Sequence, residues 1–339
     1  MRYRTATYRV ILLVILMISS VPSISSSAGE SFDEWLTRLR TEAIARGISV
    51  ETLDAALTGL EPVPRVIELD RRQPEIKQGF WEYLNTRVSD DRIRTGRKLL
   101  RENRDLLEKI RAKYGVQPQF LVAIWGLETN FGRYTGGFKV IDALATLAYD
   151  ERRSSFFRKE LFNALAILDE GHINISAMSG SWAGAMGQIQ FMPSSFARFA
   201  VDADGDARKD IWNSLPDIFE SAANYLTGAG WRHGYTWGRE VMLPPGFNTE
   251  NAGKDKEKPL SGWEALGVRG IDGRDLPSED IKASMILPAG SEGPAFLVYD
   301  NYRAILKWNN SHNYAISVCH LADRLIWQGP LQGRGSGTE

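Results

Sequence analysis

The stretch "FLVAIWGLETNFG" (residues 120–132) is almost wholly apolar until Glu128 interrupts it. If the stretch is numbered as a helix, Leu121, Ile124, Trp125 and Glu128 fall at positions i, i+3, i+4 and i+7 and share one face. A carboxylate on an apolar face is unfavourable unless something compensates for its lost hydration. The sequence therefore predicts an apolar helix whose single charge needs an explanation.

Two explanations for Glu128 follow from elementary chemistry. In the first, the carboxylate forms a structural ion pair with a buried arginine such as Arg133 or Arg152. In the second, burial raises the pKa of the carboxyl group, which then stays protonated near neutral pH and can protonate a glycosidic oxygen. The spacing alone favours the ion pair, so the choice depends on the other motifs.

The bulk composition narrows the function classes. The chain has 339 residues, of which 43% are hydrophobic, enough for one large domain or two medium-sized domains. The net charge of −1 and the pI of about 6.5 give no overall basic field, so no nucleic acid partner is expected. Ten tryptophans and eleven tyrosines mostly pack in cores, and they leave rings that can line a sugar-binding cleft. Cys319 is the only cysteine, so no disulfide forms within the chain.

Residues 1–28 are typical of a secretory signal peptide. Three arginines precede an apolar run over 10–21, and small residues follow up to Ala28, the expected cleavage position. The apolar run is short for a membrane-spanning helix of about 20 residues, and an uncleaved anchor is the alternative. No cysteine lies near this position to carry a lipid. We therefore expect export to the periplasm.

Helical patterns dominate the rest of the chain, so a mainly α fold is predicted. The segments "ASMILP" (283–288) and "AFLVYDN" (295–301) are typical of short strands in a small sheet. The predicted parts are an N-terminal helical domain over 29–115, a core over 116–240, a small β part over 241–300, C-terminal helices over 301–328 and a disordered tail over 329–339.

The segment "SGSWAGAMGQIQFMPSS" (179–195) is rich in glycine and other small residues, which permit close approach of the backbone to another segment or to a ligand. Ser181, Gln188 and Gln190 add neutral hydrogen-bonding side chains suited to amide and hydroxyl groups. A simple turn between two helices is the alternative. It does not explain why two amides alternate with apolar residues in one tight loop.

The segment "DADGDARKD" (202–210) resembles a calcium-binding loop. Its acids Asp202, Asp204, Asp206 and Asp210 stand at positions 1, 3, 5 and 9 of an EF-hand pattern. The match is partial, because Ala207 replaces the usual glycine and Asn213 replaces the final glutamate, for which Asp217 is a substitute if the loop is longer. Four neighbouring acids repel one another unless a cation neutralises them, so Ca²⁺ is favoured over a solvated acidic turn.

Taken together, these segments resemble the lytic murein transglycosylase B family. The resemblance covers roughly 31–328, and it is carried by "WGLETNFG", "DALATLAYDERR", "GSWAGAMGQIQFMPSS", "DADGDARKDIW", "SAANYL" and "WNNSHNYAISV". No single segment is specific, but their combination and order are. The resemblance implies a lysozyme-like α core, flanked by the N-terminal helical domain and the small β insert.

The resemblance also implies roles for individual residues. Glu128 matches the family's catalytic acid, and Arg152 and Arg153 match an arginine pair near that acid. The peptidoglycan-contacting positions match Ser181, Gln190, Tyr225, Asn309 and Tyr314. A structural Ca²⁺ is implied at Asp202, Asp204, Asp206 and Asp210, with no cofactor required for catalysis. Trp308 stands where one relative has tyrosine, which should preserve ring stacking without the hydroxyl.

The hypothesis that follows is a lytic transglycosylase. It would cleave the β-1,4 bond between N-acetylmuramic acid and N-acetylglucosamine and leave 1,6-anhydromuramyl ends, with Glu128 as the single acid and base and with assistance from the substrate. The expected partners are peptidoglycan glycan strands, with cell-wall synthesis and division complexes as further candidates, and a monomer is expected.

Three alternatives remain from the residues alone. A hydrolytic muramidase needs a second carboxylate, for which Asp142 and Asp150 are candidates, although Asp142 also suits a helix N-cap. A non-catalytic peptidoglycan-binding protein needs no second carboxylate. In an adaptor, the acidic loop over 202–210 is itself the functional centre.

Overall fold

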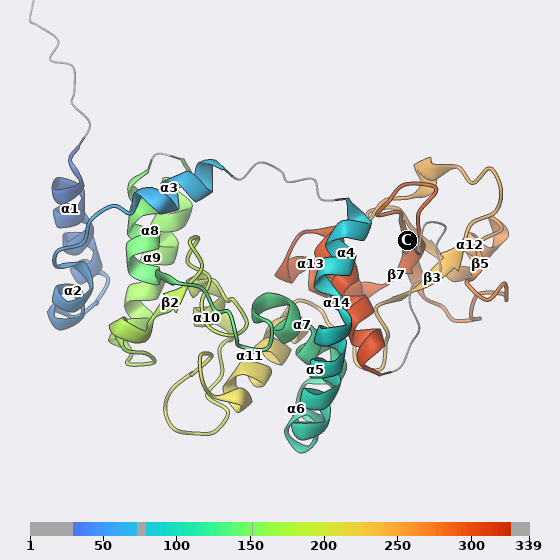
Figure 1. The fold of residues 1–339 in the computed structure, drawn as a ribbon, viewed down its shortest axis with the longest axis horizontal. Helices are drawn as coiled ribbons and strands as arrows, with labels where there is room; N and C mark the ends of the chain where they lie inside the picture. The colour runs from blue at the N-terminus through green and yellow to red at the C-terminus, as the bar shows by residue number, and fades with distance from the viewer. Residues whose placement is uncertain (1–29, 73–78, 151, 327–339) are drawn as a thin grey trace, which may run out of the picture.

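The computed structural model describes residues 30–72, 79–150 and 152–326 (Figure 1). The predicted signal peptide (1–28) and tail (329–339) lie outside these ranges. Helices predominate in the described part, which confirms the mainly α fold. None of the helices there is both long and apolar enough to cross a membrane.

One flank of the molecule, on the left of Figure 1, is mainly helical. It contains α1 (Phe32–Ala45), α2 (Val50–Leu57), α3 (Pro64–Arg71), α8 (Val140–Tyr149) and α9 (Ser154–Asp169). Hydroxyl groups at the start of α2 fasten it to the end of α9, because Ser49 and Thr52 both donate to the Asp169 carboxylate. These bonds satisfy polar groups where two helix ends meet.

A second helical group surrounds α7 (Pro118–Thr129). It contains α4 (Phe80–Arg87), α5 (Asp90–Glu102), α6 (Arg104–Tyr114), α11 (Leu215–Gly228) and α14 (His312–Leu325). Within the predicted N-terminal helical domain (29–115), α2 and α3 contact α9 and α8 on the first flank, whereas α5 and α6 contact α7 and α4 contacts α14. Both groups contribute to one continuous hydrophobic core with the predicted central part.

Helix α7 is the centre of this second group. Ten of its twelve residues are buried, so it is covered on all sides rather than along one stripe. Pro118 opens the helix at a position that needs no N–H donor. Because α5, α6, α11 and α14 all contact α7, its last turn is held rigidly, and Glu128 there is only partly buried.

The β part forms one antiparallel sheet at the right of Figure 1, in the order β4-β6-β7-β3-β5. Its strands are β3 (Gly238–Met242), β4 (Glu257–Pro259), β5 (Arg269–Gly270), β6 (Lys282–Ile286) and β7 (Ala295–Val298). The two predicted strands correspond to β6 and β7. A separate hydrophobic cluster includes the fully buried Trp263 of α12 (Leu260–Ala265). Strand β3 begins before residue 241, so the sheet crosses the predicted boundary.

Short elements connect these parts. They are β1 (Phe138–Lys139), β2 (Ser179–Gly180), α10 (Pro193–Phe199), α13 (Asp300–Trp308) and the 3₁₀ turns η1 (Ile175–Ala177) and η2 (Thr249–Asn251). Strands β1 and β2 pair antiparallel, with Phe138 opposite Gly180. This pairing holds the segment that follows α7 against the start of the glycine-rich loop.

Candidate active site

Glu128 lies in the last turn of α7, and the chain turns sharply after it. Asn130 and Phe131 have φ angles of 51° and 61°, a conformation that non-glycine residues rarely adopt. The Thr129 hydroxyl secures this turn by donating to the backbone carbonyl of Gln188 at 2.7 Å. The carboxyl group therefore projects from a fixed helix end.

Two neutral donors hold the Glu128 carboxyl group. The Tyr314 hydroxyl donates to Oε1 at 2.6 Å, and the Trp308 indole N–H donates to the same oxygen at 2.9 Å. Within the described part of the chain, Oε2 has no hydrogen-bond partner and Glu128 forms no ion pair. The ion-pair explanation is therefore not what the structure shows, and Arg152, one of its candidates, pairs elsewhere.

The pKa of Glu128 is raised to about 7, chiefly because burial disfavours the charged form. The bonds from Tyr314 and Trp308, and the positive charge of Arg87, stabilise the carboxylate and limit this rise. Such a group is close to half-protonated at neutral pH. It can give up a proton and take one back at little free-energy cost, as a residue that is both acid and base must do.

Helix α4 adds two residues that the sequence analysis missed. The negative charge of Glu128 acts on the Tyr83 hydroxyl, whose pKa is raised first by burial. The Arg87 guanidinium lies 5.4 Å from the centre of the Tyr83 ring. Since α4 packs on α14, which carries Tyr314, these side chains complete the surroundings of the acid. No motif around 80–87 marks them, so the sequence carried no usable signal.

Aromatic rings extend the site on the side of Trp308. Its ring centroid lies 4.7 Å from that of Tyr225 and 5.2 Å from that of Phe191. The Tyr225 hydroxyl donates to the Lys307 carbonyl at 2.6 Å, which fixes the ring. The ring contacts expected of Trp308 are thus present, and its N–H also donates to Glu128.

The glycine-rich loop is held by its own polar groups. The Ser181 hydroxyl accepts from the Ala185 N–H at 3.0 Å. The Gln190 side chain donates to the Thr135 carbonyl at 3.0 Å, and its backbone has a φ of 50°. Ser181 and Gln190 are both partly exposed. Their role as substrate contacts stays a prediction.

Gln188 connects this loop to α7 and is structural. Its side-chain oxygen accepts from the Trp125 indole at 2.7 Å, and its amide nitrogen donates to the Trp212 carbonyl at 2.7 Å. Both ends of the amide are thus used within the protein. The expectation that Gln188 is free to bind a ligand is therefore not supported by the structure.

No hydrogen bond or ion pair joins Glu128 to Arg152, Arg153 or Asn309 within the described residues. Arg152 and Arg153 both pair with the fully buried carboxylate of Asp70 in α3, Arg152 at 3.4 Å. No interaction links either arginine to Glu128 within the described chain. Asn309 is exposed at the end of α13, directly after Trp308. Contacts of these three residues with a substrate also stay predictions.

The acidic loop brings together a different set of carboxylates from the predicted one. Oxygen atoms of Asp202, Asp204 and Asp217 lie within 4.8 Å of one another. Asp206 and Asp210 lie outside this group, and each accepts from a nearby backbone N–H group, as Asp202 and Asp217 also do. Asp217, considered as a substitute ligand on sequence grounds, is the buried member. Its pKa is raised by burial and by the charges of the other two acids.

Comparison with known proteins identifies the family of this chain. The model of the family described as "Transglycosylase SLT domain" matches residues 31–323. Membrane-bound lytic murein transglycosylase B of Escherichia coli (strain K12) is 31% identical over 258 residues, which are 74% of this chain and 68% of that relative.

Two solved structures are also similar to this chain. SltB3 from Pseudomonas aeruginosa in complex with NAG-anhNAM-pentapeptide has a TM-score of 0.88 and 46% identity, and the match covers 90% of this chain and 82% of that one. Lytic transglycosylase Slt35 of Escherichia coli in complex with calcium has a TM-score of 0.76 and 27% identity, and the match covers 88% and 94%. These likenesses support the lysozyme-like α core. The chain therefore belongs to the lytic murein transglycosylase B family of enzymes.

Proposed function

We propose that this protein is a lytic transglycosylase that cleaves the β-1,4 bond between N-acetylmuramic acid and N-acetylglucosamine in peptidoglycan and leaves 1,6-anhydromuramyl ends. The observation that carries the proposal is the state of Glu128, whose pKa is about 7 and whose carboxyl group two neutral donors hold without a cation. The relatives support the substrate, since two of the similar structures hold NAG-anhNAM-pentapeptide and NAG-NAM-pentapeptide.

The reaction needs one carboxyl group in two states. Protonated Glu128 gives its proton to the glycosidic oxygen as the bond from muramyl C1 breaks. The muramyl N-acetyl oxygen stabilises the positive charge that develops at C1. The Glu128 carboxylate then takes the proton of the muramyl C6 hydroxyl, whose oxygen bonds to C1. Water is not consumed, and Glu128 ends protonated as it began, so a pKa near 7 serves both steps.

Hydrolysis by the same fold is the second candidate, and it needs another carboxylate beside the bond. Asp150 pairs with Arg71 at 3.2 Å at the end of α8. Asp142 lies in the first turn of that helix, although Lys139 rather than Asp142 is the N-cap. The side chains that act on the pKa of Glu128 are Tyr314, Trp308 and Arg87, none of them acidic. Mass spectrometry of digested sacculi distinguishes the reactions, because a hydrolysed end is one water heavier.

Replacing Trp308 with phenylalanine should shift the pH dependence. The change keeps a ring and removes the N–H donor to Glu128 Oε1. Because this donor stabilises the carboxylate, its loss raises the pKa of Glu128 further. The proton-donating form then persists to higher pH, and the alkaline limb of the kcat/KM profile should move up by about one pH unit.

Trp81→Phe is the control, because Trp81 packs on Phe80 and has no bond to Glu128. If the alkaline limb of the kcat/KM profile lies at the wild-type pH in both variants, the indole of Trp308 does not affect the pKa of Glu128.

We further propose a structural Ca²⁺ site at the acidic loop. Three carboxylates offer only oxygen ligands, which Ca²⁺ prefers, and their mutual repulsion is relieved by a cation. A solved relative contains calcium. The loop lies against the glycine-rich loop, because Gln188 N–H donates to the Ile211 carbonyl at 2.9 Å. A cation here would therefore stabilise the frame of the active site without touching the substrate.

Calcium should raise the melting temperature, and a chelator should lower it. At a hundredfold excess over Kd the gain is about 2.7 kcal/mol. Asp204→Asn should abolish the response, whereas Asp206→Asn should retain it, since Asp206 lies outside the carboxylate group. Lysis measured well below the melting temperature should not change on chelation. Loss of lysis without a change in melting temperature would instead make the loop the functional centre.

The site of action also remains a proposal. Residues 1–28 have the pattern of an export signal, so we propose that the enzyme works in the periplasm. Fractionation of cells with an antibody to the chain tests this, and recovery of the full-length chain in the cytoplasm alone would contradict it.

A further inference from the structure

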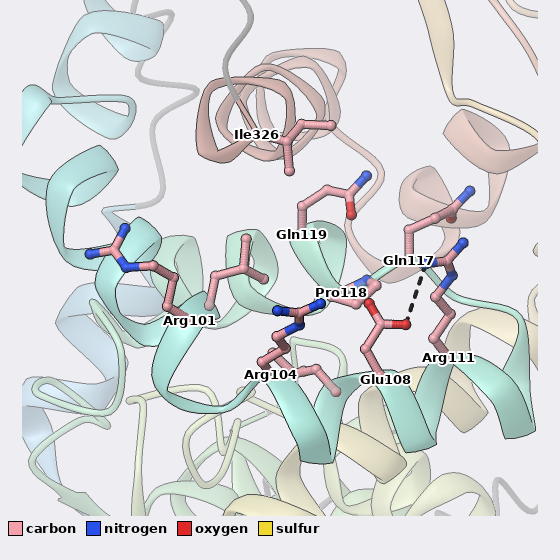
Figure 2. A pocket seen from close by; sticks show the side chains of 10 residues that line it. Arg101, Arg104, Glu108, Arg111, Gln117, Pro118, Gln119 and Ile326 are labelled. Atoms are coloured by element: carbon pink, nitrogen blue, oxygen red, sulfur yellow. Dashed lines mark hydrogen bonds and ion pairs between the residues drawn. The ribbon is translucent and has the colours of Figure 1, made fainter.

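A basic cavity lies away from the candidate active site, where the α5–α6 junction, the start of α7 and the end of α14 meet (Figure 2). Its volume is about 410 Å³, the size of a small-molecule site. Its polar lining includes Arg101, Arg104, Glu108 and Arg111, and its apolar lining includes Leu107 and Ile326. We call it the basic cavity.

The basic cavity and Glu128 lie at opposite ends of one helix. Pro118, the first residue of α7, lines the cavity, and Glu128 is ten residues further along. At 1.5 Å per residue their backbones are about 15 Å apart. A ligand in the basic cavity is therefore distinct from the sugars that react at Glu128.

Positive charge is concentrated here, and only part of it is compensated by ion pairs such as Arg94–Asp91 and Lys98–Glu102. Segment 92–113 carries nine Lys and Arg against three Asp and Glu, in a chain whose net charge is −1. Arg111 pairs with Glu108 at 3.3 Å, and each of these side chains is 50% exposed. Arg101 and Arg104 have no acidic partner within the described residues. Two guanidinium groups thus remain available to an anion.

The start of α7 adds to this charge. Gln117 occupies the N-cap position but does not cap the helix. Its amide nitrogen donates to the Tyr235 carbonyl at 3.0 Å, and its oxygen accepts from the Trp231 indole at 3.2 Å. The partial positive charge of the helix N-terminus is left uncapped beside the arginines.

We propose that the basic cavity binds the stem peptide of peptidoglycan, an inference that rests on the proposed function. An uncrosslinked stem tetrapeptide has three free carboxylates, on glutamate, diaminopimelate and the terminal alanine, and one free ammonium group on diaminopimelate. The cavity offers the two guanidinium groups of Arg101 and Arg104 to the carboxylates, beside the half-exposed Arg111–Glu108 pair, which carries one further group of each sign. Arginine suits carboxylates because its N–H groups can bind both oxygens at once. Leu100 and Ile326, which are both at least partly exposed, offer apolar surface to the alanine methyl groups.

The consequence is a second point of attachment to the wall. A peptide held in the basic cavity and a glycan held at Glu128 belong to the same polymer. Two such contacts raise the apparent affinity for intact sacculi well above that for either fragment alone.

Binding is tested in the Glu128→Gln background, so that no bond is cleaved during the titration. The probe is the stem tetrapeptide with an acetylated N-terminus, which keeps the single ammonium group of the attached stem, added to the full mature chain in a calorimeter. Arg101→Gln with Arg104→Gln should weaken peptide binding about tenfold or more, because two charge-assisted contacts are lost. The control, Arg94→Gln with Lys98→Gln, removes the same charge from α5 outside the cavity and should leave binding unchanged.

Three results would overturn the inference. The first is that the Glu128→Gln parent does not bind the peptide. The second is that Arg101→Gln/Arg104→Gln and the control lose equal affinity for it. The third is that an α-linked L-peptide of the same charge binds equally well, which would indicate a site for acidic protein segments. The proposed function has a separate readout, the anhydromuramyl product that the wild-type chain releases from sacculi. If that product forms while Arg101→Gln/Arg104→Gln binds the tetrapeptide normally, the function stands and this inference fails.

Discussion

Replacing Glu128 with glutamine should slow the lysis of sacculi by about 10³-fold or more. Glutamine keeps the shape of the side chain and can still accept from Tyr314 and Trp308. It cannot give a proton to the glycosidic oxygen or remove one from the C6 hydroxyl, so both steps lose their catalyst. The rate of dye release from labelled sacculi measures the effect.

A stability measurement separates this loss from unfolding. The pKa of the wild-type carboxyl is about 7 in the folded chain against 4.5 as its ordinary value, so the folded state holds the proton more tightly. Stability due to this group is therefore lost as the pH rises from about 4.5 to about 7. Glutamine is always neutral, so the variant should melt no lower than the wild type at alkaline pH.

Glu102→Gln is the matched control, since Glu102 is an exposed surface residue paired with Lys98 at 3.7 Å. It should lyse sacculi at the wild-type rate. Retained lysis by Glu128→Gln would remove Glu128 from the mechanism. Loss of lysis with normal binding to sacculi would exclude the non-catalytic binding protein.

Replacing Gly136 with alanine should destabilise the fold by about 3 kcal/mol or more. Gly136 has a φ of 103°, and a Cβ there would lie 2.0 Å from the backbone oxygen of Gly180. Neither backbone can yield without moving the β1–β2 pair, which holds the glycine-rich loop next to the end of α7. The melting temperature should fall by about 6 °C or more.

Gly137→Ala is a control from the next position. A Cβ at Gly137 meets nothing within 4 Å, and its φ is not left-handed. The free energy of unfolding should therefore change by less than about 0.5 kcal/mol, and the melting temperature should change little. Equal melting temperatures for the two variants would mean that the chain after α7 does not approach Gly180 as closely as the structure shows.

The sequence pattern singled out Glu128 but not all of its neighbours. Periodicity placed Glu128 on an apolar helix because the spacing of buried residues is a local property. Tyr83 and Arg87 escaped notice because an amphipathic pattern indicates that a face is buried and does not name what covers it. For the same reason, the helical patterns over 29–115 do not reveal that these helices pack against two different sets of partners.

Charged residues were the hardest to place from sequence. Arg152 and Arg153 lie on Asp70, which is more than 80 residues away in the chain and carries no motif of its own. Spacing in the acidic loop suggested Asp206 and Asp210, whereas folding selects Asp217 from the following helix. Strands β4 and β5 have only three and two residues, too few for an alternating pattern to be visible.

The most direct test of the account is a titration of the Glu128 carboxyl group in the folded protein. The ¹³C resonance of its side-chain carboxyl is assigned by its absence from the Glu128→Gln variant and is followed across the pH range. We expect its midpoint at about pH 7, where the group can both donate and accept a proton. A midpoint near the ordinary value of 4.5 would contradict the account, because the group would then be ionised at neutral pH and could not begin the reaction as an acid.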